Sequence, residues 1–169
     1  MMTTVAAAIT IGSISKDICF KTISLTCSKA IDLITYFATN THPSFGEFNL
    51  LLKKTDVHVK ISKINQLILE FQDKEDKGYN FEKSIKISIN DVDDAIKQIV
   101  NMLNETKKSK EYNETLYFNT WNWRKLDCTS SIQSLKISAK ILDKRFNDLE
   151  KVISIVGNLQ THKDTLTKI

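Results

Sequence analysis

Residues 128–156, CTSSIQSLKISAKILDKRFNDLEKVISIV, decide the fold of this chain. Their apolar side chains recur at alternating steps of four and three residues, a pattern that is typical of a helix packing one narrow seam against other helices. The seam consists of Cys128, Ile132, Leu135, Ala139, Leu142, Phe146, Leu149, Ile153 and Val156. The stretch therefore predicts a long C-terminal helix in an all-α protein.

The side of this helix away from the seam carries a second, interrupted set of apolar residues. Ile137, Ile141 and Ile155 lie within about 40° of one another on a helix of 3.6 residues per turn. The residues between them on that side are polar: Lys144, Asp148 and Lys151. In one interpretation, neighbouring helices or the chain's own N-terminus cover the isoleucines. In the other, they form a docking patch for a partner.

Two amphipathic segments occupy the first half of the chain. Apolar residues at helical spacing predict one helix over residues 13–37 and a second, continuous helix over residues 44–72. Pro43, the only proline, lies between them and suits the opening turn of the second helix. The charged turn that follows is closed by Gly78, as is common at helix ends.

The next segment gives two different signals. Ile85, Ile87 and Ile89 alternate with polar residues, and this period of two predicts an extended connector laid across the bundle. A third helix then follows, with Ser88 or Asn90 as its cap. Its first turn is acidic, as the helix dipole favours: Asp91, Asp93 and Asp94.

Four amphipathic helices joined by short or extended links predict an antiparallel four-helix bundle, with a heptad seam along the long C-terminal helix. A chain of 169 residues that is 41% hydrophobic suffices for one buried core and is too short for two. We therefore expect an apolar N-terminal segment over residues 1–12, a single helical-bundle domain over residues 13–160 and a polar C-terminal tail over residues 161–169.

The charge pattern disfavours specific recognition of nucleic acid. The net charge is +4, and Arg124 and Arg145 are the only arginines among 24 basic residues. Arginine makes the bidentate contacts that read bases and phosphates, so its scarcity argues against this function. The dispersed lysines leave non-specific binding as a weaker alternative, which would depend strongly on salt.

Three widely spaced cysteines do not make a disulfide framework. Cys19 and Cys27 would stand about 12 Å apart along one helix, too far for a disulfide bond. No stretch reaches the roughly 20 apolar residues of a membrane span, and residues 1–15 lack the basic start of a signal peptide. We therefore expect an intracellular protein in a reducing compartment, cytoplasmic or within a virion, and not a secreted one.

The sequence offers little catalytic chemistry. Its four glycines form no phosphate-binding loop, and the common hydrolase, zinc-protease and CxxC patterns are absent. His58 lies beside the apolar stripe of the helix predicted over residues 44–72, and no catalytic partner converges on it. The acidic cluster that begins at Asp91 is explained by a helix start, and the one before Gly78 by a solvated turn. The sequence thus predicts no catalytic residue, no metal, no cofactor and no small-molecule substrate.

An aromatic cluster precedes the long helix. Trp121 and Trp123 lie next to Arg124, a combination that can stack on bases or form the hot spot of a protein interface. The interpretation that we favour is structural: large rings close the end of the bundle where the chain turns into its longest helix.

The N-terminal segment has the most unusual composition of the chain. Residues 1–15 carry no charge and include Val5, Ile9 and Ile11. An uncharged apolar segment leading into a helical bundle resembles, in outline, the N-terminal bundles of membrane-permeabilising cell-death executors of the HeLo and mixed-lineage-kinase-like type. That resemblance implies release and membrane insertion of the first helix. The segment departs from the usual membrane-binding design because no basic residue precedes Lys16.

Two classes of function therefore compete. The first is a non-enzymatic interaction or scaffold protein, a structural component of a multisubunit complex or virus particle, whose spare apolar surfaces meet a protein partner or another copy of the chain. The alternative is a membrane-perturbing bundle that acts through residues 1–15. An enzyme is the least favoured interpretation.

Overall fold

The computed structural model describes residues 20–40, 45–115 and 127–166. Five helices make up these ranges: α1 (Phe20–Thr39), α2 (Gly46–Lys54), α3 (Val57–Asp76), α4 (Lys83–Thr115) and α5 (Thr129–Leu166). Because the described residues contain no strand, the prediction of an all-α fold is confirmed. A membrane span of sufficient length and hydropathy is absent from the described helices.

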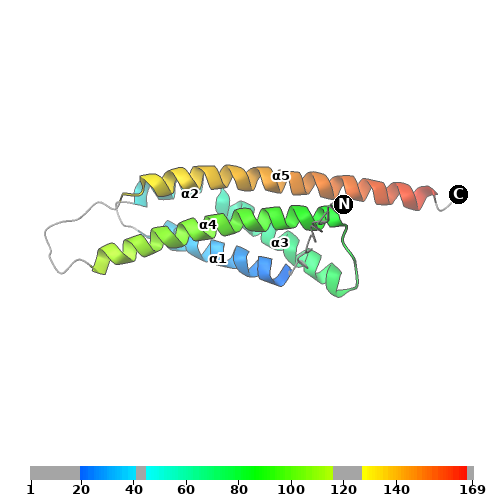
Figure 1. Cartoon of the computed structure of the whole chain (residues 1–169), viewed down its shortest axis with the longest axis horizontal. Helices are drawn as coiled ribbons and strands as arrows, with labels where there is room; N and C mark the ends of the chain where they lie inside the picture. Colours follow the sequence, from blue (N-terminus) through cyan, green and yellow to red (C-terminus); the bar gives the residue numbers. More distant parts are fainter. Residues whose placement is uncertain (1–19, 41–44, 116–126, 167–169) are drawn as a thin grey trace, which may run out of the picture.

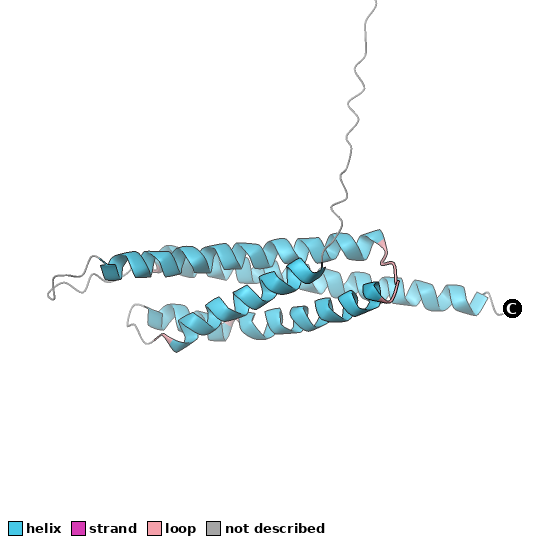
Figure 2. Cartoon of the chain, turned by 90° about the horizontal axis from the view of Figure 1, so that it is seen from below, coloured by secondary structure: helices cyan, strands magenta, loops and turns pink. Residues whose placement is uncertain are grey.

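The four longer helices lie lengthwise beside one another, with the short α2 near one end (Figures 1 and 2). Phe20 at the start of α1 contacts Phe81, just before α4, at a ring separation of 5.7 Å. At the other end, the ammonium group of Lys107 in α4 lies 4.7 Å from the ring centre of Tyr36 in α1. These two contacts show that α1 and α4 run in the same direction.

The other close pairs of long helices are antiparallel. The Thr106 hydroxyl of α4 donates to the Ser131 hydroxyl of α5 at 2.9 Å, and Asp91 of α4 pairs with Arg145 of α5 at 3.3 Å. Residue numbers therefore fall along α4 as they rise along α5. α3 likewise runs opposite to α1 (Figure 1). Successive long helices thus alternate in direction along the chain.

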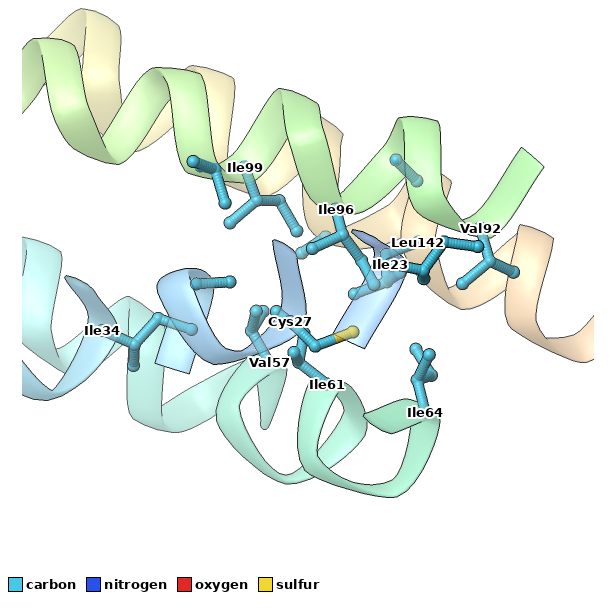
Figure 3. Packing of buried hydrophobic residues seen from close by; sticks show 14 of the residues in the cluster. Ile23, Cys27, Ile34, Val57, Ile61, Ile64, Val92, Ile96, Ile99 and Leu142 are labelled. Atoms are coloured by element: carbon cyan, nitrogen blue, oxygen red, sulfur yellow. The ribbon is translucent and has the colours of Figure 1, made fainter. Parts of the chain in front are cut away.

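The hydrophobic core lies where α1, α3 and α4 meet, and α5 closes it from the far side of α4 (Figure 3). Packing is most extensive between α4 and α5, between α1 and α3, and between α1 and α4. The residues labelled in Figure 3 are Ile23, Cys27 and Ile34 of α1, Val57, Ile61 and Ile64 of α3, Val92, Ile96 and Ile99 of α4, and Leu142 of α5, all buried. α1 and α4 therefore each contact two long helices, whereas α5 packs mainly on one.

Aromatic rings fill both ends of this core. Phe20, Phe71 and Phe81 form one cluster, with ring separations between 4.8 and 6.1 Å. Phe37 meets the rings of Phe45 and Phe48 at the other end, at 5.2 and 5.1 Å. Edge-on and tilted packing of this kind suits the charge distribution of the rings and adds to the stability that their burial supplies.

The predicted continuous helix over residues 44–72 is in fact two helices. α2 ends at Lys54 and α3 begins at Val57, and between them Asp56 adopts the left-handed conformation at φ 50°. The hydroxyl of Thr55 donates to a backbone carbonyl one turn earlier, at 2.8 Å. Threonine and aspartate compete for backbone groups, and aspartate tolerates the left-handed region, so this pair interrupts the helix. The apolar spacing missed the break because Val57 resumes the stripe.

The glycine-closed turn after α3 forms as predicted. Gly78 has φ 85°, a conformation that glycine adopts at little cost. The N–H of Gly78 donates to the carbonyl of Glu75 at 2.8 Å, and the N–H of Tyr79 donates to that of Lys74 at 2.9 Å. This pair of bonds is the Schellman arrangement, which satisfies the last carbonyl groups of a helix.

The predicted extended connector is instead the beginning of α4, which starts at Lys83. Ile85 and Ile89 are buried, one helical turn apart, while Ile87 points outward. Three alternating isoleucines fit a period of two, but the outer two also fit helical spacing and continue into the buried stripe of α4. The acidic residues predicted at a helix start therefore lie inside this longer helix.

Candidate functional site

α5 buries one side and exposes another. On the buried side, the core residues are Cys128 (which precedes the helix), Leu135, Ala139, Leu142, Leu149 and Val156, with Ile132, Phe146 and Ile153 half-buried. On the outer side, Ile137 is 54% exposed and Ile155 is 58% exposed. Ile141, predicted to share that face, is half-buried and packs against the core. The structure therefore leaves two of these three isoleucines open to solvent.

Ile137 and Ile155 share one line along the helix. They are 18 residues apart in the sequence, which corresponds to five turns and about 27 Å along the helix axis. A bound partner that contacts both residues must therefore lie along α5 for much of its length.

Three further apolar side chains that are exposed or half-buried lie toward the C-terminal end of α5 and at the start of α4. Leu159 of α5 is 54% exposed, Ile87 of α4 is 52% exposed, and Val152 of α5 is half-buried. On an α-helix, Val152, Ile155 and Leu159 fall within about 60° of one another. We call the four residues Ile87, Val152, Ile155 and Leu159 the C-terminal patch.

The ion pair between Asp91 and Arg145 shows why Ile87 belongs to this patch. Ile87 lies one turn before Asp91 on α4, on nearly the same face. Val152 lies two turns after Arg145 on α5, again on nearly the same face. Because the two helices are antiparallel, both steps lead toward the same end of the molecule. At that end α5 runs past the start of α4 (Figure 1).

Polar residues divide the C-terminal patch from Ile137. Lys151 and Asp148 form an exposed pair at 3.7 Å, and Arg145 and Asp91 form a half-exposed pair at 3.3 Å. Pairs of this kind contribute little to stability, roughly 0–1 kcal/mol. They instead give the outer face of α5 a charged centre between Ile137 and the C-terminal patch.

His58, the sequence's main candidate for acid–base chemistry, is exposed on α3. Its backbone carbonyl accepts a hydrogen bond from Ser62. Among the described residues, no group of three histidine, cysteine or acidic side chains is placed to hold a metal ion. The acidic residues Asp91, Asp93 and Asp94 lie along α4 rather than around a common point.

A buried thiol and a buried carboxylate face each other between α1 and α4. Burial, with a further contribution from the negative charge of Asp93, raises the pKa of Cys27 from 9.0 to about 12. One oxygen of Asp93 pairs with Lys97 at 2.5 Å, and the other oxygen is buried without a hydrogen-bond partner among the described residues. A thiol with so high a pKa is a poor nucleophile at neutral pH, so this arrangement is structural.

The break between α2 and α3 leaves a cleft of about 280 Å³ that faces α5. Lys60 spans it, with its ammonium group 2.5 Å from Asp143 and 3.2 Å from the carbonyl of Thr55. The remaining lining consists of Lys54, Asp56, Lys136, Ala139 and Lys140. The cleft has an excess of positive charge, but its two acidic residues and exposed lysines do not converge on one bound atom.

Several residues singled out in the sequence lie outside the described ranges. They are Val5, Ile9, Ile11, Trp121 and Trp123. The sequence signals missed Ile87 and Leu159. The sequence pattern places Ile87 in an extended connector and ends the apolar seam at Val156, whereas α4 begins at Lys83 and α5 continues to Leu166. The spacing of Val152, Ile155 and Leu159 is the signal that identifies this part of the patch.

Comparison of the chain with protein-family models, curated proteins and solved structures finds no match. The outer face of α5 therefore has to be interpreted from its own geometry.

Proposed function

We propose that this chain is a non-enzymatic interaction protein, a structural component of a larger assembly such as a multisubunit complex or a virus particle. The observation that carries the proposal is the exposure of Ile137 and Ile155, five turns apart on the same line of α5. Single exposed apolar residues are ordinary, but apolar groups aligned along one helix and extended by neighbours mark a contact surface.

The proposed framework for this surface is an antiparallel four-helix bundle in which α5 contributes the heptad seam. The alternating directions of the long helices support this arrangement, with α1 and α4 in contact across the diagonal. The burial of Leu135, Leu142 and Leu149 supports the seam. Such a bundle would hold the outer face of α5 straight and rigid, so a partner would bind without reordering the backbone.

The chemistry of the outer face favours a protein partner with an apolar helix or strand edge. Burying a fully exposed isoleucine contributes roughly 1.5–3 kcal/mol, so Ile137 and Ile155, each a little over half exposed, would together supply roughly 1.5–3.5 kcal/mol of the about 8 kcal/mol of a micromolar affinity. The charged groups between them would then set the register. A second copy of the chain is the other partner that this chemistry permits.

The experiment is sedimentation of an extract of the native cells on a density gradient, with variants of the chain expressed in place of the wild type. Wild-type chain should sediment as part of a large particle. The double variant Ile137→Asp/Ile155→Asp should move to the position of the free chain, because an aspartate cannot be buried in an apolar contact without a large cost.

Leu50→Asp is the matched control, because Leu50 is 64% exposed and belongs to a different helix, α2. It should leave the sedimentation of the chain unchanged. Wild-type chain that sediments alone in the extract, or a Leu50 variant that is lost from the particle as fully as the double variant, would contradict the proposal.

A further inference from the structure

We infer that the C-terminal patch is the docking site for the N-terminal segment of the same chain, residues 1–15. The contact itself needs no external partner. Its regulatory consequence, that a partner arriving at α5 has to displace the segment, rests on the proposed function.

The patch gathers exposed apolar surface that the described helices leave uncovered. Ile87, Ile155 and Leu159 each expose about half of their side chains or more, and they come from two different helices. The pairing of Asp91 with Arg145 places the start of α4 two turns away, level with about Ile153 of α5. Ile155 and Leu159 therefore lie at and beyond the point where α4 begins, so that helix does not shield them.

The N-terminal segment enters the fold at this same end of the molecule. Phe20, the first residue of α1, contacts the rings of Phe71 and Phe81 at 6.1 and 5.7 Å. Phe81 immediately precedes α4, and the start of α4 is the end of the molecule at which the patch lies. The chain that precedes Phe20 thus joins the helices at the end of the molecule at which the patch lies.

The length of that chain suits the distance. Residues 12–19 provide a connector of eight residues, which spans up to about 26 Å when extended. One helix with its side chains is about 10–12 Å in diameter, so α4 and α5 side by side span about 20–24 Å. An extended connector is therefore long enough to pass the end of α4 and reach the outer side of α5, which would leave residues 1–11 to occupy the patch.

The chemistry of the segment matches that of the patch. Residues 1–15 contain no charged side chain, and they include the apolar residues Val5, Ile9 and Ile11. Apolar side chains without charged neighbours can cover apolar surface without burying an unpaired charge.

Size favours this occupant over a second copy of the chain. A stable interface between two proteins buries roughly 800 Å² on each partner, from about 20–30 residues. The C-terminal patch has four apolar residues, far fewer than such an interface requires. A tethered segment needs less surface because its effective concentration is high.

Hydrogen exchange of the intact chain, followed by mass spectrometry, tests the contact from both sides. In the wild type, amides within residues 3–15 should exchange at least about tenfold more slowly than in an unstructured peptide of the same sequence. The double variant Ile155→Asp/Leu159→Asp should abolish this protection. Ile137→Asp is the matched control, since Ile137 is equally exposed on the same helix but lies outside the patch, and it should keep the protection.

Three results would overturn the inference. The first is exchange of residues 3–15 at the peptide rate in the wild type. The second is protection that persists in the double variant, because the segment would then dock elsewhere. The third is protection that vanishes on dilution together with a dimer in sedimentation, which would assign the patch to a second copy. None of these results depends on the native particle, so a failure here is distinguishable from a failure of the proposed function.

Discussion

α1 and α5 use their apolar residues in opposite ways. α1 packs against α2, α3 and α4, and it buries seven of its twenty residues. α5 is almost twice as long, yet its packing is largely confined to α4 and α2, and its outer face keeps Ile137 and Ile155 exposed. The longest helix, with the most regular stripe, therefore lies at the edge of the core. α1 supplies stability, and α5 supplies spare surface.

The largest expected difference between the two helices is in the cost of removing an aromatic ring. Phe37 of α1 is fully buried among other rings, whereas Phe146 of α5 is half-buried. Phe37→Ala should lower the free energy of unfolding by about 3–5 kcal/mol, and Phe146→Ala by about half as much, because cavity and transfer costs follow burial. Urea unfolding of both variants checks this. An equal or larger loss for Phe146→Ala would place α5 in the centre of the core.

The thiols give the next largest difference. Because the pKa of Cys27 is raised from 9.0 to about 12, the unfolded chain loses this proton first as the pH rises. Stability should thus be unaffected by Cys27 below pH 9.0 and should fall above it by about 1.4 kcal/mol per pH unit. Urea unfolding at alkaline pH of the wild type and of Cys27→Ala isolates this slope as the difference between the two proteins.

Cys128, just before α5, is the thiol with which Cys27 is compared. Burial, and then the charge of Asp127, raises the pKa of Cys128 as well, but less of that thiol is enclosed. A thiol reagent should therefore modify Cys128 faster than Cys27 in the folded protein. Faster reaction at Cys27 would show that the reagent reaches this thiol, which would contradict its burial between α1 and the neighbouring helices.

A buried and an exposed ion pair should differ by a smaller amount in their contribution to stability. Lys97→Met leaves the buried carboxylate of Asp93 without its partner and should cost about 1–2 kcal/mol, a value that allows for the half-exposed lysine. Lys151→Met breaks the exposed pair with Asp148 on the outer face of α5 and should cost less than about 0.5 kcal/mol. The measurement is unfolding by urea at neutral pH. Equal costs would remove the electrostatic distinction between core and outer face.

The smallest expected effect on stability belongs to the outer face itself. Ile137→Asp should change the free energy of unfolding of the isolated chain by less than about 0.5 kcal/mol, because a substitution at an exposed position outside the C-terminal patch disturbs little packing. Thermal unfolding of the purified variant tests this expectation. A loss of several kcal/mol from Ile137→Asp would mean that this residue supports the fold rather than an interface.

Periodicity predicted most of the helices but not how they meet. The apolar stripe of α5 could be derived because it depends on local spacing, and the turn after α3 could be derived because Gly78 accepts a positive φ. The break at Asp56 was missed because Val57 restores the stripe immediately after it. The start of α4 was misassigned because Ile85, Ile87 and Ile89 satisfy two periods at once, and only burial by other helices decides between them.

The sequence likewise predicted only part of the candidate site. The exposure of Ile137 and Ile155 follows from their place on the helix opposite the stripe. Sequence spacing gives Ile141 nearly the same angular position on the helix, yet it packs against the core, because the width of the buried face depends on the neighbouring helix. Ile87 could not be assigned to the patch from sequence, because its position beside α5 depends on the antiparallel register of the two helices.

Site-specific photo-crosslinking tests most directly whether the outer face of α5 is an interaction surface. A photoreactive residue would replace Ile137 on α5 or, in a matched chain, Leu50 on α2, and both chains would be irradiated in the native extract. We predict one dominant crosslinked product from position 137 and none from position 50. No product from position 137, or the same set of products from both positions, would contradict the assignment of α5 as the contact face.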